Sequence, residues 1–181
     1  MKRMKLLCIA LCFAASASYG QTFTLKSNDL GGQGTMNQVF NGFGCTGGNM
    51  SPQLSWENVP EGTKSFAINM YDPDAPTGSG FWHWVVFDIP ASTKELKTNA
   101  GNPDKNLLPA GTIQSLTDFG KAGYGGPCPP EGHGFHQYII TVYALKTDKL
   151  GLDKNTNPAM VGFYLHSNTI QKSSLVFYYK R

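Results

Sequence analysis

Residues able to do chemistry gather in two short stretches of the sequence. The first starts with Asp72, in the segment DPDAP, and reaches His83 after a glycine-rich turn. The second starts with Gly126, in the segment GPCPP, and leads to His136 and Tyr138. Carboxylates, imidazoles and a phenol can bind a small polar ligand or transfer protons. Because each stretch delivers a histidine from a loop rich in glycine and proline, the two histidines are candidates for one shared pocket.

The prolines of the first stretch predict a stiff corner. Each proline fixes its own φ near −65° and biases the preceding residue to an extended conformation. Aspartate is common in turns because its side chain bonds to nearby backbone. We therefore expect Asp74 and Pro76 to shape the corner rather than to bind a ligand.

Alternating hydrophobicity predicts a strand after each loop. In the first strand Trp82 and Trp84 fall on one face, as core residues, and His83 falls on the other face with Val85, Phe87 and Ile89. A lone histidine on an apolar face is usually a core residue with a local hydrogen-bond partner. The second strand repeats the arrangement, with Tyr138, Ile140, Val142 and Ala144 following His136 on one face, and this repetition favours a pocket.

The remaining elements predict a β-rich fold. A helix is expected late in the chain, with Asn157 as N-cap and Pro158 in its first turn. Residues 94–123 are irregular, and we expect them to lie beside the pocket. Strand spacing favours antiparallel sheets, and the candidate strands are Phe23–Lys26, Gln53–Trp56, Ser65–Tyr71, Trp82–Ile89, Gln137–Leu145 and Ser174–Tyr179.

The N-terminal 20 residues read as a secretory signal peptide. Three basic residues precede an apolar run from Leu6 to Ala15, and small residues offer cleavage after Ala17 or Gly20. The alternative is a membrane-spanning helix, but about 20 apolar residues are needed to cross roughly 30 Å of hydrocarbon. We expect residues 21–181 to form a single periplasmic or secreted domain without an integral membrane segment.

Removal of the signal peptide changes the charge of the protein. The sequence has 15 Lys and Arg against 12 Asp and Glu, and three of the basic residues lie in the first 20 positions. The remaining chain is formally neutral and has no basic cluster, so nucleic acid is not an expected partner.

Two of the four cysteines, Cys45 and Cys128, remain after signal removal. In an oxidising compartment we expect them to form a disulfide, with free thiols or a metal site as the alternatives. Since Cys128 lies in the second stretch, this bridge would shape the pocket wall.

At these residues the sequence resembles the phosphatidylethanolamine-binding protein family, also called the Raf-kinase-inhibitor-like proteins, and especially its bacterial secreted branch of the YbcL type. The two histidine stretches carry the resemblance, together with CTGGNMSPQLSW from Cys45 to Trp56, and it covers nearly the whole mature chain. It implies a mainly β fold: an antiparallel, Greek-key β-sandwich with a few peripheral helices, one of them near the C-terminus.

The resemblance also implies a ligand site. The matching positions are Asp72, His83, Gly126, Cys128, Pro130, His136 and Tyr138. The imidazoles, the phenol and the backbone N–H groups of Gly126 and Cys128 are the expected donors to a phosphoryl group. Asp72 has two possible roles: it orients a histidine, or it accepts hydrogen bonds from the ammonium of a phosphoethanolamine-like ligand. Cys128 stands where many animal members have glycine. Gln137 stands where many members have arginine, and the loss of this fixed charge weakens the case for tight phosphate binding.

We expect a binding protein for small anionic or phosphorylated ligands, without cofactor and without enzymatic activity. The alternative is a modulator or inhibitor of a protein partner, of protease-inhibitor or signalling-inhibitor type, whose pocket is incidental. His133 and His136 lack a third metal ligand at ordinary spacing. Ser79 lies between glycines but outside the nucleophile-elbow pattern, which predicts a turn rather than serine catalysis.

Overall fold

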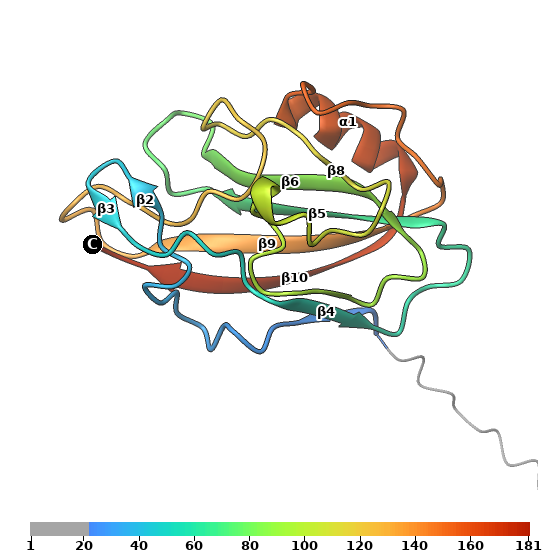
Figure 1. Ribbon diagram of the computed structural model, residues 1–181, viewed down its shortest axis with the longest axis horizontal. Coiled ribbons are helices and arrows are strands. Elements are labelled where there is room, and N and C mark those ends of the chain that lie inside the picture. The colour runs from blue at the N-terminus through green and yellow to red at the C-terminus, as the bar shows by residue number, and fades with distance from the viewer. Residues whose placement is uncertain (1–21) are drawn as a thin grey trace, which may run out of the picture.

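A five-stranded antiparallel sheet forms the centre of the computed structural model, which describes residues 22–181 (Figure 1). Its strands lie in the order β10-β9-β5-β6-β8. Their bounds are β5 Ser65–Asp72, β6 Phe81–Pro90, β8 Ile113–Gln114, β9 His136–Leu145 and β10 Thr169–Tyr179.

Two smaller sheets and two helices complete the described fold. One sheet has the order β1-β4-β7 and the other pairs β2 with β3. Their bounds are β1 Thr24–Lys26, β2 Asn41–Gly42, β3 Cys45–Thr46, β4 Leu54–Glu57 and β7 Glu95–Leu96, with a 3₁₀ helix at Pro103–Lys105 and helix α1 at Pro158–Asn168. The predicted mainly β, antiparallel architecture with a helix near the C-terminus is confirmed. The predicted signal peptide, residues 1–20, lies outside the described residues, and the single domain of residues 21–181 stays a prediction.

Helix α1 starts where the sequence predicts. The Asn157 side chain accepts a hydrogen bond from the Met160 N–H at 2.9 Å, and Pro158 takes the first helical position, where no donor is needed. Val161 and Leu165 are the helix residues buried against the five-stranded sheet. No helix within residues 22–181 is long and apolar enough to cross a membrane.

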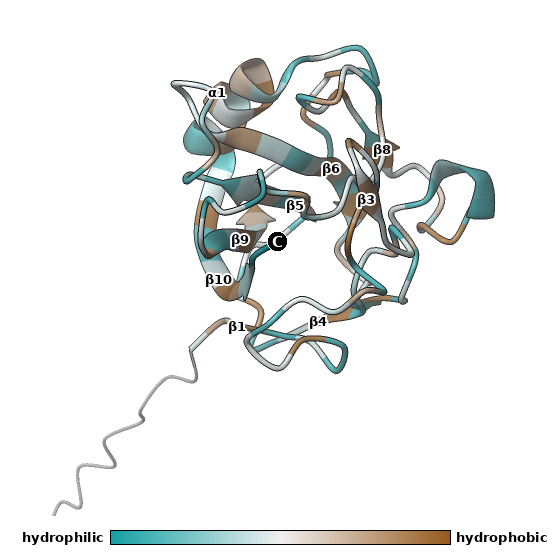
Figure 2. Cartoon of the chain, turned by 90° about the vertical axis from the view of Figure 1, so that its left-hand side faces the viewer, coloured by the Kyte–Doolittle hydropathy of each residue, from teal (hydrophilic) through white to brown (hydrophobic). Residues whose placement is uncertain are grey.

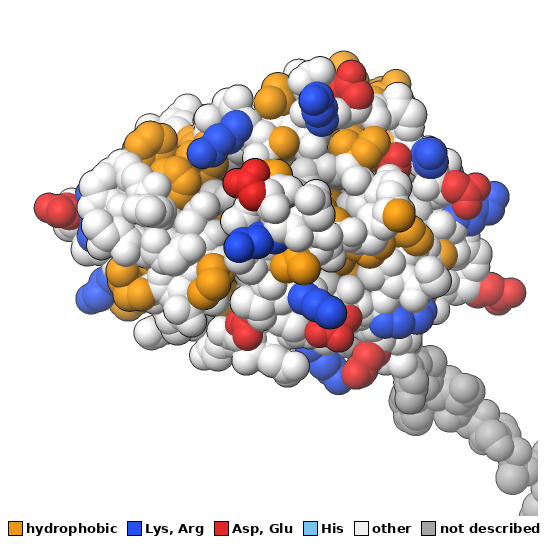
Figure 3. Space-filling view, in the orientation of Figure 1, with side chains coloured by type: hydrophobic (Ala, Val, Ile, Leu, Met, Phe, Trp, Pro, Cys, Tyr) orange, Lys and Arg blue, Asp and Glu red, His pale blue; other side chains and the backbone are white. Residues whose placement is uncertain are grey.

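The five-stranded sheet separates two apolar layers. Figure 2 shows α1 on one side of the sheet and β1 and β4 on the other. The larger inner layer packs the β1-β4-β7 sheet against the central strands, and it contains the fully buried Trp56, Trp84 and Tyr138. The outer layer lies under α1 and contains Val85 and Phe87. On the outside, basic and acidic side chains are interspersed over the face in Figure 3 without a large area of one sign.

Two irregularities in β6 overturn the predicted faces of this strand. The pairing with β5 passes from Met70↔Trp84 to Tyr71↔Trp82, so His83 is an extra residue of a β-bulge. Trp82 consequently packs with the outer layer and Trp84 with the inner layer, although strict alternation placed both on one face. The His83 ring lies 5.2 Å from the ring of the inner residue Tyr138.

The second irregularity lies further along β6. Phe66 pairs with Ile89 but Ile68 pairs with Val86, and Asp88 takes a left-handed φ of 57°. Ile89 therefore joins the inner layer instead of the face shared with Phe87. In β9, by contrast, the predicted alternation is confirmed, with Tyr138, Ile140, Val142 and Ala144 all in the inner layer.

The strand order brings the two histidine stretches together. Strand β5 lies between β6 and β9 and is antiparallel to both. The end of β5, at Asp72, therefore lies at the same end of the sheet as the starts of β6 and β9, near His83 and His136. The hairpin β2-β3 and the C-terminal end of the chain also lie at this end of the molecule, on the left in Figure 1.

Candidate functional site

A small cavity opens at this end of the sheet, where β5 ends and β6 and β9 start. All seven residues predicted as ligand-binding line it: Asp72, His83, Gly126, Cys128, Pro130, His136 and Tyr138. Its volume is ≈ 120 Å³, well below the roughly 300–1,000 Å³ of sites for drug-sized ligands. The cavity therefore suits a small group, or the end of a larger molecule.

His136 is held between a carboxylate and a second imidazole. Its Nδ1 lies 2.8 Å from Asp72 Oδ2, and both side chains are almost completely buried. Because a carboxylate only accepts, His136 Nδ1 carries the hydrogen of this bond. On the other side of the ring, His136 Nε2 lies 2.9 Å from Nδ1 of the exposed His133. Of the two roles predicted for Asp72, this geometry supports the orientation of a histidine.

The Asp72–Pro76 corner also fixes the start of β9. Asp72 Oδ1 accepts a hydrogen bond from the Asp74 N–H at 2.8 Å, and Asp74 Oδ2 accepts one from the Gln137 N–H at 2.8 Å. Asp74 thus ties the corner to the residue next to His136 without lining the cavity, while Pro76 forms part of the cavity wall. These positions are compatible with the pocket-shaping role of Asp74 and Pro76, which stays a prediction.

His83 is held by backbone rather than by a carboxylate. Its Nδ1 donates to the Gly125 carbonyl at 2.8 Å, and the Gly125 N–H donates to the His83 carbonyl at 2.9 Å. Burial lowers the pKa of His83 to about 4, although the Gly125 carbonyl and the charge of Asp72 act in the opposite direction. His83 is therefore neutral at pH 7, and since Nδ1 carries the hydrogen, Nε2 is a hydrogen-bond acceptor.

Tyr138 contributes an unpaired donor. Its ring is fully buried, and its hydroxyl has no hydrogen-bond partner among residues 22–181. Burial, then the negative charge of Asp72 and the hydrogen-bonding interaction of its carboxylate with the hydroxyl, raise the pKa of Tyr138 above its ordinary value, so the hydroxyl keeps its proton. The Asp72 carboxylate thus lies near the hydroxyl, although no contact between them meets hydrogen-bond geometry. Leaving a buried polar group unpaired is unfavourable, by about 1–3 kcal/mol. Such a group beside a cavity is a place where a ligand or a water can form a hydrogen bond.

The loop from Gly125 to Cys128 is fixed by packing, and one predicted donor already has a partner. The Gly126 N–H donates to Asn49 Oδ1 at 2.8 Å and is already committed to this bond, so the predicted contact of Gly126 with a ligand stays a prediction. The Phe40 N–H donates to the Pro127 carbonyl at 3.0 Å. A Cβ at Gly126 would lie 1.8 Å from the Gln38 carbonyl oxygen, so this close approach requires glycine. The role of Gly126 is to let the loop pack, and a donor role for Cys128 stays a prediction.

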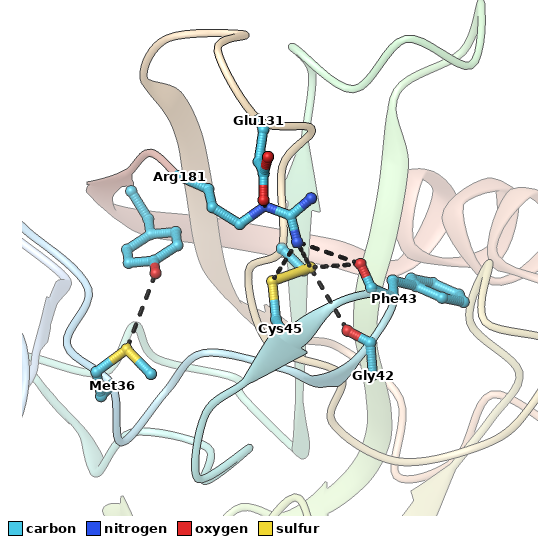
Figure 4. Close-up of polar contacts among 8 residues, drawn as sticks. Met36, Gly42, Phe43, Cys45, Glu131 and Arg181 are labelled. Carbon is cyan, nitrogen blue, oxygen red and sulfur yellow. Dashed lines mark hydrogen bonds and ion pairs between the residues drawn. A yellow bond between two sulfur atoms is a disulfide. The ribbon is translucent and has the colours of Figure 1, made fainter.

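The predicted disulfide between Cys45 and Cys128 is present, with a Cα–Cα distance of 6.0 Å. It joins β3 to the cavity wall. Arg181 covers it, as Figure 4 shows, with Nη1 at 3.2 Å from the Phe43 carbonyl oxygen and 3.4 Å from Cys45 Sγ. Its Nε lies 3.7 Å from the exposed carboxylate of Glu131. Arg181 therefore connects the end of β10 to the wall that the disulfide forms.

The apolar side of the cavity was not predicted. Phe43, Phe81 and Phe119 line it, and Phe119 also packs on Phe40 at 4.6 Å between ring centroids. Phe119 comes from residues 94–123, which were expected beside the pocket, but most of that segment lies elsewhere and contains β7, β8 and the 3₁₀ helix. Phe43 is 71% exposed at a left-handed φ of 53°, between two glycines. That glycine–aromatic–glycine pattern was the available sequence signal.

The described residues also bear on the catalytic alternatives. Within residues 22–181, no three His, Cys, Asp or Glu side chains are grouped so that they could hold a metal ion. The Thr77 hydroxyl, near the cavity, donates to the Gly80 carbonyl, and Cys128 is in the disulfide.

Comparison with known proteins identifies the family. Residues 26–180 match the model of the phosphatidylethanolamine-binding protein family. The UPF0098 protein YbcL of Escherichia coli K12 is 48% identical over 172 residues, which cover 94% of this chain and 94% of that protein. The UPF0098 protein YbhB of the same organism is 48% identical over 153 residues, covering 83% of this chain and 96% of YbhB.

Solved structures agree with this assignment. The crystal structure of E. coli YbcL, described as a new member of the mammalian PEBP family, superposes with a TM-score of 0.86 at 50% identity and covers 88% of this chain and 98% of that one. A phosphatidylethanolamine-binding protein homolog from Chlamydia trachomatis shares the fold, with a TM-score of 0.73 at 24% identity over 88% of this chain and 97% of that one.

Proposed function

The chain belongs to the phosphatidylethanolamine-binding protein family, and from this premise and the cavity geometry we propose that it binds a small phosphoryl group without transforming it. The observation that carries the proposal is the buried, unpaired Tyr138 hydroxyl in a cavity that also contains the oriented His136. A phosphoryl oxygen is a strong acceptor and would pair with this donor.

The hydrogen-bonding pattern defines the ligand more closely. Tyr138 offers a donor and the neutral His83 offers an acceptor at Nε2. A ligand with both acceptor oxygens and one donor fits this pair, such as hydrogen phosphate with its P–OH or phosphoethanolamine with its ammonium. Asp72 adds negative charge at the base of the cavity, which disfavours a fully deprotonated anion. We therefore infer a protonated or zwitterionic phosphoryl ligand.

The absence of enzymatic activity is part of the proposal. An acyl or phosphoryl transfer enzyme needs a nucleophile next to a base. Among the residues that line the cavity, the Cys128 sulfur is oxidised and the Thr77 hydroxyl is bonded to backbone. We also propose that the protein acts in the periplasm or outside the cell, in accordance with the predicted signal peptide and with the Cys45–Cys128 disulfide, which persists in oxidising compartments.

Isothermal titration of the purified protein with phosphate and with phosphoethanolamine tests the proposed function. Replacement His136→Gln removes the oriented imidazole, and we expect affinity to fall by about 10-fold or more, the equivalent of one hydrogen bond to a charged ligand. His166→Gln is the matched control, because His166 is exposed on α1. Absence of binding by the unmodified protein would contradict the proposal and favour the alternative, a surface that binds a protein partner.

A further inference from the structure

His133 lies next to the cavity residue His136, and neither the predicted site nor the wall of the cavity includes it. It lies in the loop between Pro130 and His136, and its side chain is exposed. Its Nδ1 nevertheless lies 2.9 Å from His136 Nε2, with 5.2 Å between the ring centroids. An exposed imidazole thus forms a hydrogen bond with a buried one at the edge of the cavity.

This contact uses the one nitrogen of His136 that is left for a ligand. Nδ1 is committed to Asp72 at 2.8 Å, so only Nε2 can bond to a molecule entering the cavity. With the hydrogen of His136 on Nδ1, Nε2 is the acceptor nitrogen of the neutral imidazole, and His133 Nδ1 donates to it across 2.9 Å, a distance at which the P–OH of a protonated phosphoryl ligand would also donate. His133 and the ligand P–OH therefore compete for the same acceptor.

The backbone around His133 allows it to leave. Gly132 and Gly134 flank it with φ values of 75° and 88°, and a Cβ added at either glycine would meet nothing within 4 Å. Within the described chain, the other hydrogen bond of His133 is a backbone turn contact, from its N–H to the Pro130 carbonyl at 3.2 Å. Its imidazole can rotate outward without disturbing packed side chains.

We propose that His133 occupies the ligand position on His136 in the free protein and is displaced when the phosphoryl ligand binds. This inference rests on the proposed function, because it assumes that the ligand bonds to His136 Nε2. In the free protein, His133 takes the place of the ligand, so that both ring nitrogens of His136 keep a hydrogen-bond partner. Its contact lowers the apparent affinity, since the ligand must first break it.

The replacement His133→Ala tests this competition by phosphate titration calorimetry, with His166→Ala as the exposed histidine control. Removing a competing neutral hydrogen bond should tighten phosphate binding by about fivefold, and the control should leave it unchanged. Equal or weaker binding by His133→Ala, with normal binding by the unmodified protein, would overturn the inference and leave the proposed function standing.

A second measurement observes the displacement directly. Histidine side-chain NMR of the unmodified protein should show the His133 resonances moving toward the values of a free imidazole as phosphate saturates the site. His133 resonances that stay fixed while those of His136 shift would overturn the inference. If neither the unmodified protein nor His133→Ala binds phosphate, the proposed function and the inference both fail.

Discussion

The His83 side and the His136 side of the cavity begin alike and are held differently. Each histidine follows a loop rich in glycine and proline and stands at the start of a central strand. His83 is bonded to the carbonyl of Gly125, in a loop, whereas His136 is bonded to the carboxylate of Asp72, at the end of a strand. The first imidazole is anchored by a dipole and the second by a charge.

This difference gives the two imidazoles separate tasks. Burial deprives the protonated form of His83 of the solvation that it would have in water, so the pKa of His83 falls to about 4 and its Nε2 stays an acceptor. His136 is oriented by Asp72 and exchanges its second hydrogen bond between His133 and, by our proposal, the ligand. Histidine thus has two tasks in this cavity: His83 is a fixed acceptor, and His136 forms a contact that can change partners.

Breaking the disulfide should cause the largest loss of stability, and it should disturb the His83 side of the cavity more than the His136 side. The double replacement Cys45→Ser with Cys128→Ser opens a covalent loop with a sequence separation of 83 residues. The chain-entropy treatment gives a loss of about 4–5 kcal/mol in the free energy of unfolding, measured by urea denaturation. Because Gly125 lies in the loop that the disulfide restrains, the His83 resonances should broaden or shift while the contact between His136 and Asp72 persists.

Reduction of the unmodified protein by a thiol is the control for the two substitutions and should give the same loss of stability. Equal disturbance of both histidines would show that the His136 side also depends on the loop, so that the two sides of the cavity would not be held differently.

The second largest effect that we expect is a pH dependence of stability that arises from His83. The folded-state pKa of about 4 lies below the ordinary 6.5, so the unfolded chain binds more protons between these values. The stabilisation is present above pH 6.5 and is lost as pH falls toward 4. A shift of this size corresponds to about 3 kcal/mol. We expect His83→Gln to lack this component when unfolding free energies are compared between pH 7 and pH 4.

His166→Gln is the matched control for this comparison, and carboxylate titration is common to all three proteins. If His83→Gln retained the full dependence of the unmodified protein, His83 would be as accessible to protons in the folded state as in the unfolded state.

The contrast between the two sides also shows where sequence reasoning succeeds. The two glycine- and proline-rich loops predicted that Asp72, His83 and His136 meet. The structure brings them together because antiparallel pairing places the end of β5 beside the starts of β6 and β9. On β9 the alternation is regular and every predicted face is confirmed. On β6 the bulge at His83 shifts the faces, and the strand sequence itself carries no sign of an extra residue in the pairing.

Other features depend on contacts between segments that are distant in sequence. The Gly126 N–H bonds to Asn49, 77 positions away, and Arg181 reaches the disulfide from the end of β10. Phe43 and Phe119 come to the cavity through loops whose course is set by tertiary packing. Periodicity and turn signals describe local conformation, so they cannot specify which loop a donor or an aromatic ring will contact.

The replacement Tyr138→Phe should produce the smallest change in stability. The sign of this change in the free energy of unfolding is informative, because it tells whether the hydroxyl serves the fold or the ligand. The Tyr138 ring lies between the two sides, with centroid distances of 5.2 Å to His83 and 6.5 Å to His136. Because its hydroxyl has no partner among residues 22–181, removing it deletes an unfavourable buried group and leaves the ring packing intact. We expect unfolding free energy to stay equal or to rise by up to about 1 kcal/mol, while phosphate binding weakens. A destabilisation above about 1 kcal/mol in urea would mean that the hydroxyl serves the fold, and the two sides would then be joined by a structural bond instead of by the ligand.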